Sequence, residues 1–457
     1  MAWTINNGKL YFNSVLYTGN GSTQSITGVG FQPDWVWYKS RSDAYNNGLF
    51  DIVRGVDKFL SSNSSGEEST ISGIASFNSD GFTVGSDAGS NGSSKTFVGW
   101  SWLAAGTAPS NTYVVKVVSD SGNKYRFDDF GTSAVTLEIS EGGTFTFDQS
   151  DSSNSGHPLR FSTTSNGTHG GGSEYTTGVT TNGTPGNAGA YTRITVAASA
   201  PTLYYYCTQH SGMGGQANTP TTNSFSNFAG SIQSNISPNT TSGFSIVSYT
   251  GTGSTATVGH SLGTAPSMMI IKARSFSEDW LVYHQSLGNT HAINLNLTNA
   301  ASSSVNYWQN TTPSSSVFYI GANDKCNKSS ATYVAYCFAE KQGFSKFGSY
   351  VGNGSSTDGT FVYTGFLPAF IMFKSPTTTG GWEIHDNKRD PFNVSSKRLF
   401  PNLSNAEATE NYVDFNSQGF KFRTNDANGN TNATSYIYMA FAENPFTSSA
   451  GTPVTAR

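Results

Sequence analysis

A segment that occurs three times constrains this chain more than any other feature, because three copies of one segment should adopt one fold. Each copy opens with a Tyr-x-Gly-x-Gly sequence, found at residues 17–21, 249–253 and 350–354. Each copy then has a proline that leads an apolar run, and the run ends on a lysine six residues later, at residues 33–39, 266–272 and 368–374. Proline is tolerated at the first residue of a strand, and apolar residues at successive positions indicate a strand covered on both faces. We therefore expect Trp35, Met268 and Phe370, which share one position in the three runs, to be buried in equivalent strands.

The composition indicates the fold class. Glycine accounts for 50 of 457 residues, aromatic residues for 13% and charged residues for only 12%, and Ser, Thr and Asn are abundant. Such a chain favours short strands joined by many turns, and helical patterning is nearly absent. The chain is also too long for one hydrophobic core, so it should divide into about three or four domains. We predict an all-β protein built of tandem β-sandwich domains.

Several classes of function find no support in the sequence. The formal net charge of −4 provides no basic surface for nucleic acid or for an anionic membrane. No apolar run is long enough to cross a bilayer, and Met1–Asn6 lacks the charged and apolar parts of a signal peptide. No nucleophile elbow, paired-carboxylate constellation or zinc-binding helix motif is present. We therefore expect a protein that is not an enzyme, does not insert into a membrane and does not follow the conventional export route.

The three cysteines are too few for a disulfide framework in so long a chain. Alignment of the copies places Cys337 at the position of Ser101 and Ala440, so this position takes a small side chain. A packed thiol at Cys337 is therefore favoured over a disulfide with Cys326.

Soft and imidazole side chains gather at metal-binding spacing in one stretch, residues 204–213. Three tyrosines precede Cys207, His210 follows three residues later, and Met213 comes three residues after that. A trigonal copper site with two histidines, one cysteine and a long axial methionine needs these groups and one more imidazole, for which His157 is the best candidate. The alternative for Cys207 is a small buried side chain on a strand, the commonest place for a free cysteine.

These residues resemble a cupredoxin, and the spacing is similar to the ligand loop of the amicyanin and pseudoazurin type. The resemblance covers roughly residues 113–215. It implies a Greek-key β-sandwich between the first and second copies, with a type 1 copper-like site in which the Cys207 thiolate makes the strong bond and Met213 the weak axial one. The ligands that it implies are His157, Cys207, His210 and Met213.

Two features depart from the cupredoxin pattern. Gly156 stands where cupredoxins often have an asparagine just before the first histidine ligand. A long polar insertion, residues 162–189, separates the two halves of the domain. We interpret His169, inside this insertion, as a solvated loop residue.

The repeated unit looks like a module that recurs in structural proteins of bacteriophages of marine bacteria. The resemblance rests on the Tyr-x-Gly-x-Gly opening, the proline-led apolar strand and the ending Tyr333–Glu340 of the second copy. It implies a virion protein, made in the host cytoplasm and exposed on the particle as a tail fibre or another surface appendage. Its partners would be other virion proteins and a host cell-surface receptor, either a glycan or a protein. Two alternatives stay open: a capsid decoration or head fibre protein of the same phage, and an extracellular copper protein that transfers electrons.

The three copies diverge most after their second strand, in residues 55–65, 286–304 and 387–406. Such divergence is typical of loops displayed on a fixed scaffold, so we expect these loops to contact the host. Large apolar faces in a fibre often become subunit contacts, and the resemblance therefore favours a homotrimer. The predicted divisions are an N-terminal attachment segment (1–16), β-sandwich repeats (17–110, 244–343 and 344–447), a cupredoxin-like domain (111–217), a linker or edge segment (218–243) and a C-terminal tail (448–457).

Overall fold

The computed structural model describes residue 5 and residues 7–442, and β-strands dominate this part of the chain. Most neighbouring strands pair antiparallel, so the predicted all-β class is confirmed. None of the helices described is long and apolar enough to cross a membrane. They are short turns: η1 (Gly8–Leu10), α1 (Ala88–Asn91), η2 (Ser152–Asn154), η3 (Gly167–Gly170), η4 (Gln285–Leu287), α2 (Val305–Trp308) and α3 (Asp324–Asn327).

The same order of four strands recurs in three large sheets, and we name the corresponding parts of the chain unit 1 (7–106), unit 2 (244–343) and unit 3 (344–442). In each sheet the proline-led strand lies between the closing aromatic strand and the second strand of the copy. Trp35, Met268 and Phe370 lie in these central strands and are at most 1% exposed, which confirms their predicted burial. The strands in spatial order are β1 (Phe12–Thr18), β9 (Thr96–Trp102), β3 (Trp35–Ser40) and β4 (Gly48–Asp51) in unit 1, β21 (Phe244–Thr250), β28 (Thr332–Phe338), β23 (Met268–Ala273) and β24 (Leu281–His284) in unit 2, and β29 (Ser345–Val351), β36 (Ser435–Ala442), β31 (Pro368–Lys374) and β32 (Glu383–Asp386) in unit 3.

A second sheet completes each unit, so each unit has two sheets. These second sheets are β2 (Gln24–Thr27), β8 (Gly81–Val84) and β7 (Ile74–Asn78) in unit 1, β22 (Ala256–Gly259) and β27 (Val317–Ile320) in unit 2, and β30 (Phe361–Tyr363), β35 (Gly419–Phe422), β34 (Ala408–Asn416) and β33 (Ser395–Arg398) in unit 3. Further strands extend two of the large sheets, namely β5 (Gly55–Leu60) and β6 (Ser69–Thr70) in unit 1, and β25 (His291–Asn294) and β26 (Ser302–Ser303) in unit 2.

The Tyr-x-Gly-x-Gly turn is built in the same way in all three units. In unit 1 the Tyr17 hydroxyl donates to the Ser90 carbonyl at 2.8 Å, and the side chain of Asn91 donates to the carbonyl of Ser22, just after the turn. A Cβ atom on Gly19 would lie 2.3 Å from the Gly92 carbonyl oxygen, so only glycine fits there. The equivalent residues are Tyr249, Asn327 and Gly251 in unit 2, and Tyr350, Asn430 and Gly352 in unit 3. The repeated signature therefore specifies a turn.

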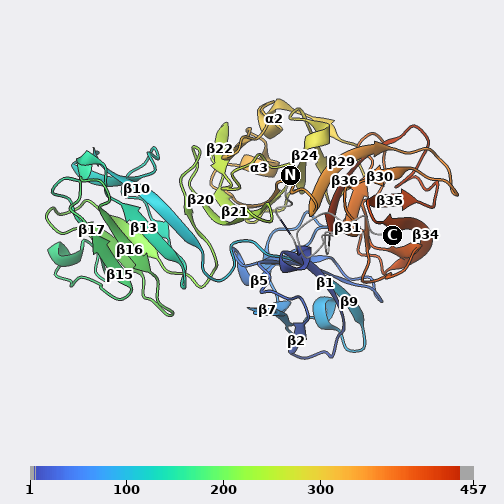
Figure 1. The fold of residues 1–457 in the computed structure, drawn as a ribbon, viewed down its shortest axis with the longest axis horizontal. Coiled ribbons are helices and arrows are strands. Elements are labelled where there is room, and N and C mark those ends of the chain that lie inside the picture. Colours follow the sequence, from blue (N-terminus) through green and yellow to red (C-terminus); the bar gives the residue numbers. More distant parts are fainter. Residues whose placement is uncertain (1–4, 6, 443–457) are drawn as a thin grey trace, which may run out of the picture.

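The three large sheets pack around one shared core, so the units form a ring and not a string (Figure 1). Trp35 of unit 1 stacks on Tyr336 of unit 2 with ring centroids 4.4 Å apart. Aromatic contacts also join unit 2 to unit 3 and unit 3 to unit 1, through Phe338 with Phe347 at 5.9 Å and Phe370 with Trp102 at 5.8 Å. The apolar faces from which we expected a homotrimer are thus buried inside a single chain and give that expectation no support.

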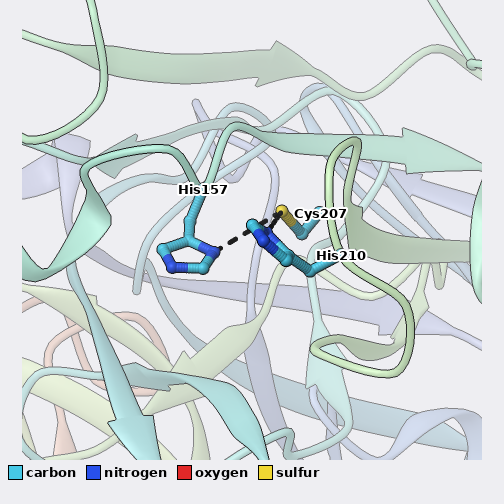
Figure 2. A group of neighbouring side chains, drawn as sticks. All are labelled: His157, Cys207 and His210. Carbon is cyan, nitrogen blue, oxygen red and sulfur yellow. Dashed lines mark hydrogen bonds between the residues drawn. The ribbon is translucent and has the colours of Figure 1, made fainter.

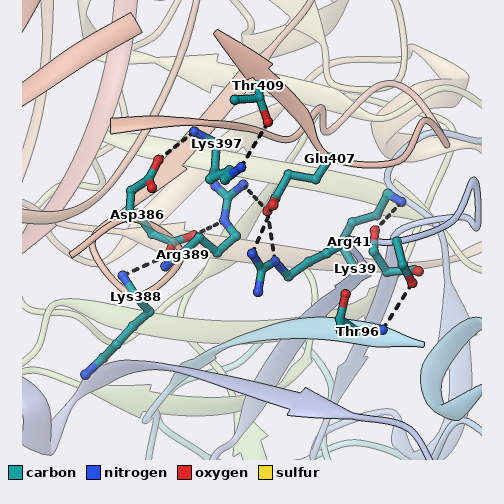
Figure 3. A network of polar contacts seen from close by, with 12 residues as sticks. Lys39, Arg41, Thr96, Asp386, Lys388, Arg389, Lys397, Glu407 and Thr409 are labelled. Carbon is teal, nitrogen blue, oxygen red and sulfur yellow. Dashed lines mark hydrogen bonds and ion pairs between the residues drawn. The ribbon is translucent and has the colours of Figure 1, made fainter. Parts of the chain in front are cut away.

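One backbone contact recurs at all three boundaries between units. The amide of Glu68 in unit 1 donates to the Arg274 carbonyl of unit 2 at 2.9 Å. The equivalent pairs at the other two boundaries are Ala301 with Pro376 and Glu407 with Arg41, both at 2.8 Å. Arg274 and Arg41 also form paired hydrogen bonds with the carboxylates of Glu68 and Glu407, and Figure 3 shows Arg41 and Arg389 both reaching Glu407. Because such pairs fix the orientation of two planar groups, they specify how neighbouring units align.

The three divergent segments lie at these boundaries, so the expectation that they are freely displayed is wrong for much of their length. Their backbone carbonyls accept side-chain hydrogen bonds from the neighbouring unit: Ser61 from Trp280 at 2.8 Å, Asn294 from Trp382 at 3.0 Å and Phe400 from Asn47 at 3.1 Å. Each segment therefore contacts a different neighbouring unit. In the third segment, residues 391–393 are exposed, and Phe392 is 84% exposed.

Residues 110–218 form a fourth unit, which projects to one side of the ring and runs from cyan to green in Figure 1. Its two sheets enclose an aromatic core that includes Tyr113, Phe147, Phe161 and Tyr205. Two of its strand pairs are parallel, β10 with β13 and β12 with β18. The sheets are, in spatial order, β11 (Asn123–Phe127), β10 (Ser110–Ser119), β13 (Thr144–Asp148), β16 (Tyr191–Thr195) and β15 (Val179–Asn182), and β12 (Leu137–Glu138), β18 (Gly215–Asn218), β17 (Leu203–Cys207) and β14 (Leu159–Ser162).

The segment that joins the fourth unit to unit 2 is an edge segment. β19 (Phe225–Asn227) pairs with β20 (Ser234–Asn239), and β20 pairs with β21, so the large sheet of unit 2 continues into it. Phe228 packs on Tyr113 with ring centroids 5.6 Å apart, which ties the cores of the two units together. At the N-terminal side, β1 begins at Phe12, inside the predicted attachment segment, while the predicted tail 448–457 lies outside the described residues.

Candidate metal centre

Strand pairing brings three of the four predicted ligands together. β17 ends at Cys207 and pairs antiparallel with β14, in which Leu159 lies opposite Cys207. His157, just before β14, therefore lies beside the residues that leave β17, and His210 lies in the loop that follows. Figure 2 shows both imidazole rings turned toward the Cys207 sulfur.

The distances between the ligand atoms are short enough for the three side chains to share one metal ion. The Cys207 Sγ atom lies 3.9 Å from Nδ1 of His157 and 3.8 Å from Nδ1 of His210. With metal–nitrogen bonds of about 2.0 Å and metal–sulfur bonds of about 2.3 Å, a sulfur–nitrogen separation of about 3.7 Å is expected for trigonal geometry and about 3.5 Å for tetrahedral geometry. The observed separations are close to both values, so the three atoms could share one ion, and two histidines with one cysteine form a donor set that suits copper.

The three side chains differ in exposure. Cys207 is fully buried, His157 is partly buried and His210 is exposed. Burial lowers the pKa of His157 below its usual value, and the neighbouring His210 lowers this pKa further. The neutral imidazole that results is the form that binds a metal ion. The sulfur is therefore shielded from water, while one imidazole faces solvent.

Met213, the predicted axial ligand, lies in the same loop as His210. Its side chain is 1% exposed and belongs to the hydrophobic core that includes Cys207. Its main-chain carbonyl accepts a hydrogen bond from the Tyr125 amide at 2.9 Å, which fixes the end of the loop. A buried thioether in the same core as Cys207 is compatible with a weak axial contact, and that role stays a prediction.

Two buried side chains hold the backbone at His157. The Tyr125 hydroxyl donates to the His157 carbonyl at 2.8 Å, and the side-chain amide of Gln149 donates to the same oxygen at 2.9 Å. Gln149 also accepts from the Leu159 amide at 3.1 Å. Burial raises the pKa of Tyr125, and nearby Cys207 raises it further, so the hydroxyl stays protonated and able to donate.

The polar insertion holds the ligand loop from the other side, a role that the sequence did not indicate. The Asn166 side chain accepts from the Gly212 amide and donates to the Ser211 hydroxyl, both at 2.8 Å. His169 is exposed, as expected of a loop residue, but its Nε2 lies 3.0 Å from the Cys207 carbonyl oxygen. In the sequence, Asn166 precedes a glycine and His169 stands among glycines, so both look like ordinary turn residues. No local signal marks them as residues that hold the ligand loop.

The other two cysteines have a different environment. Cys326 and Cys337 are free and buried, which confirms the packed thiol predicted at Cys337. Burial raises the pKa of Cys326 to about 12, so its thiol stays protonated and unreactive. In the part of the chain that the structure describes, the group at Cys207 is the one cluster of three or more His, Cys, Asp or Glu side chains whose ligand atoms lie within 4.8 Å of one another.

The fold and this cluster define an all-β protein of packed sandwich units with a His–Cys–His group in the unit outside the ring. The chain belongs to a family described as a domain of unknown function, DUF7483, whose model matches residues 7–126 and 162–445. The match includes Cys207, His210 and Met213 and leaves out residues 127–161, where His157 lies. Comparisons with curated proteins and with solved structures gave no match.

Proposed function

We propose that the fourth unit binds one copper ion in a type 1-like site. The observation that carries the proposal is the placement of one cysteine sulfur and two imidazole nitrogens at separations that would let them share one ion. His157, Cys207 and His210 would hold the ion, and Met213 would approach it along the axis. Copper bound to a thiolate supplies intense visible absorption and a one-electron redox couple.

A structural role for the metal fits the protein better than electron transfer. Binding stabilises a folded unit by about 4 kcal/mol when the free metal is a thousandfold above its dissociation constant. The ring contains no second cluster of this kind among the residues described, so the chain itself offers no partner centre for an electron. The exposed His210 supports the alternative, because a redox protein could dock beside its imidazole.

A titration of the full-length protein with Cu(II) tests the copper proposal. The wild type should develop a strong visible band and a higher melting temperature. Cys207→Ser should abolish the band, because a hydroxyl cannot replace the soft thiolate. Cys337→Ser is the matched control: it removes a buried thiol from unit 2, where the equivalent residue of unit 1 is Ser101, and it should leave the band unchanged. A wild-type protein with neither colour nor stabilisation would contradict the proposal.

We further propose that the chain is a structural protein of a bacteriophage virion, exposed on the particle as a tail fibre or another surface appendage. The repeated all-β module, the low charge and one exposed apolar site support this. Phe392 projects beside a hollow of about 230 Å³ that is lined by Leu367 and Phe415, among others. Large apolar side chains exposed in this way mark interaction sites, so this part of unit 3 is our candidate for contact with the host receptor or with another virion protein.

Purified phage particles provide the test. Mass spectrometry should find the chain in the particle, and labelled antibodies should place it on the tail; labelled heads would favour the capsid-decorating alternative. Phe392→Ser should weaken adsorption to the host, whereas Val305→Ser, at an exposed valine of unit 2, should leave adsorption unchanged. A chain that is missing from the particles would exclude a virion role.

A further inference from the structure

We infer that Asn166 and His169 are positioning residues of the copper site. In this view the polar insertion, residues 162–189, is a clamp that keeps the ligand loop in its metal-binding shape before a metal ion arrives. The inference rests on the proposed copper function and adds to it the residues that determine how tightly the metal is held.

The ligand loop cannot hold its own shape by burial. Residues 209–212 are all exposed, and only Cys207 before them and Met213 after them are anchored in the core. An exposed loop with little buried apolar area opens readily. His210 lies in the middle of this exposed stretch, so its position relative to the Cys207 sulfur depends on hydrogen bonds to neighbouring segments.

Asn166 supplies two of these hydrogen bonds to successive residues of the loop. Its Oδ1 accepts from the Gly212 amide and its Nδ2 donates to the Ser211 hydroxyl. Gly212 has a φ of +73°, a left-handed conformation that glycine adopts without strain. The Lys124 ammonium donates to the Gly212 carbonyl, so the main chain at Gly212, two residues after His210, is held by two neighbouring segments.

His169 holds the other end of the loop. Its Nε2 lies 3.0 Å from the Cys207 carbonyl oxygen, and donation to this oxygen fixes the peptide that links the thiolate residue to the loop. The two clamp residues therefore contact the chain directly at Cys207 and just after His210, the two ligands that β17 and its loop supply.

The clamp is itself anchored on the strand that carries Cys207. A Cβ atom on Gly167 would lie 2.4 Å from the ring of Tyr206, so the glycine backbone rests directly on that ring. Further along the insertion, the Tyr175 amide donates to the Phe161 carbonyl at 2.7 Å, and the Ser162 hydroxyl donates to the Ser173 carbonyl at 2.7 Å. Asn166 and His169 are thus presented by a segment that is fixed to β14 and β17.

The experiment measures copper binding by the full-length protein with substitutions at both clamp residues. Asn166→Ala and His169→Ala should each weaken copper binding by roughly 10- to 100-fold, the usual effect of losing a group that orients a metal ligand. Both should also shift the visible band, because His210 is then less well placed. Asn166→Asp keeps an acceptor for the Gly212 amide and His169→Gln keeps a donor for the Cys207 carbonyl, so both should recover most of the affinity.

Asn182→Ala is the matched control, since Asn182 lies in the same insertion and donates only to the Gly189 carbonyl. It should bind copper as the wild type does. A coloured wild type whose Asn166→Ala and His169→Ala variants bind copper with unchanged affinity and spectrum would overturn the clamp and leave the copper site standing. Alanine variants that lower the melting temperature of the metal-free protein and are not rescued by Asp or Gln would show a merely structural role and would also overturn it. A colourless wild type would contradict the copper function itself.

Discussion

Acidification should weaken the boundary between units 2 and 3 through His284. This histidine ends β24 and is 1% exposed. Its Nε2 donates to the Tyr438 carbonyl of unit 3 at 3.1 Å, and its Nδ1 accepts from the Ser286 amide at 3.2 Å. Only a neutral ring can donate from one nitrogen and accept at the other. Protonation therefore breaks the contact with Ser286 and places a charge in a buried boundary.

The magnitude follows from the pKa. Burial lowers the pKa of His284 to about 4, and the Tyr438 carbonyl opposes this only in part. Because an unfolded histidine has a pKa of about 6.5, the contribution of His284 to stability is fully present above that pH and is lost as the pH falls toward 4. The difference between the folded and unfolded pKa of His284 lowers the free energy of unfolding by about 3.4 kcal/mol at full protonation and by about 2.5 kcal/mol at pH 4.5.

Urea unfolding of the wild type and of His284→Gln at neutral pH and at pH 4.5 measures this contribution, because glutamine can donate to Tyr438 but does not titrate. On acidification, the free energy of unfolding of the wild type should fall by about 2.5 kcal/mol more than that of the variant. The comparison must be made between the two proteins, since burial raises the pKa of Asp34 to about 6 and that of Glu383 to about 7, and these two groups favour the folded state as the pH falls. His291→Gln, at an exposed histidine, is the control. An identical loss in wild type and His284→Gln would refute the reasoning.

Three further substitutions test the site, the ring and the turn. Met213→Leu should keep the visible band of the copper protein but shift its reduction potential, because the axial bond is long and weak; loss of the band would assign Met213 a stronger role. Trp35→Ala should destabilise the ring by about 3–5 kcal/mol in thermal or urea unfolding, and a loss below about 1 kcal/mol would contradict a shared core. Gly352→Ala would place a Cβ atom 2.3 Å from the Thr431 carbonyl oxygen and should cost well over about 1 kcal/mol, whereas Gly131→Ala, where nothing lies within 4 Å, should change stability little.

The sequence predicted the strands of the ring but not the ring. Proline and a run of apolar residues are local signals, and they were sufficient to place Trp35, Met268 and Phe370 in buried strands. A strand that is apolar on both faces reveals that both faces are covered and does not reveal by what. The contacts that close the ring join residues such as Glu68 and Arg274, which are 206 positions apart, and no local pattern encodes such a pairing.

The candidate site also combines residues that local sequence signals reveal with residues that only the three-dimensional structure reveals. Cys207, His210 and Met213 lie within seven residues of one another, so their spacing was visible in the sequence, and His157 could be added because a trigonal site needs a second imidazole. Asn166 and His169 act through hydrogen bonds to the backbone of the ligand loop. A backbone partner has no sequence signature, so these two residues could be found only once the insertion had been placed in space.

The fourth unit is also less independent than its sequence indicates, and this leads to a last prediction. Phe225 and Phe228 follow β18, the last strand of the unit, yet they cover its core and are 5% and 3% exposed. The Tyr113 hydroxyl donates to the Ser226 carbonyl at 2.9 Å, which fixes the same segment on the core.

Deleting two buried phenylalanines removes about 3–6 kcal/mol of hydrophobic stabilisation, a large part of the 5–15 kcal/mol or so that a folded domain typically has. A fragment of residues 110–232 should therefore melt cooperatively, while a fragment of residues 110–218 should melt at a much lower temperature and bind a hydrophobic dye. Copper should bind the longer fragment more tightly, because the shorter one must spend part of the binding free energy on folding. Equal melting temperatures for the two fragments would mean that the core of the fourth unit closes without the edge segment, and that its contact with unit 2 serves only to position the unit on the ring.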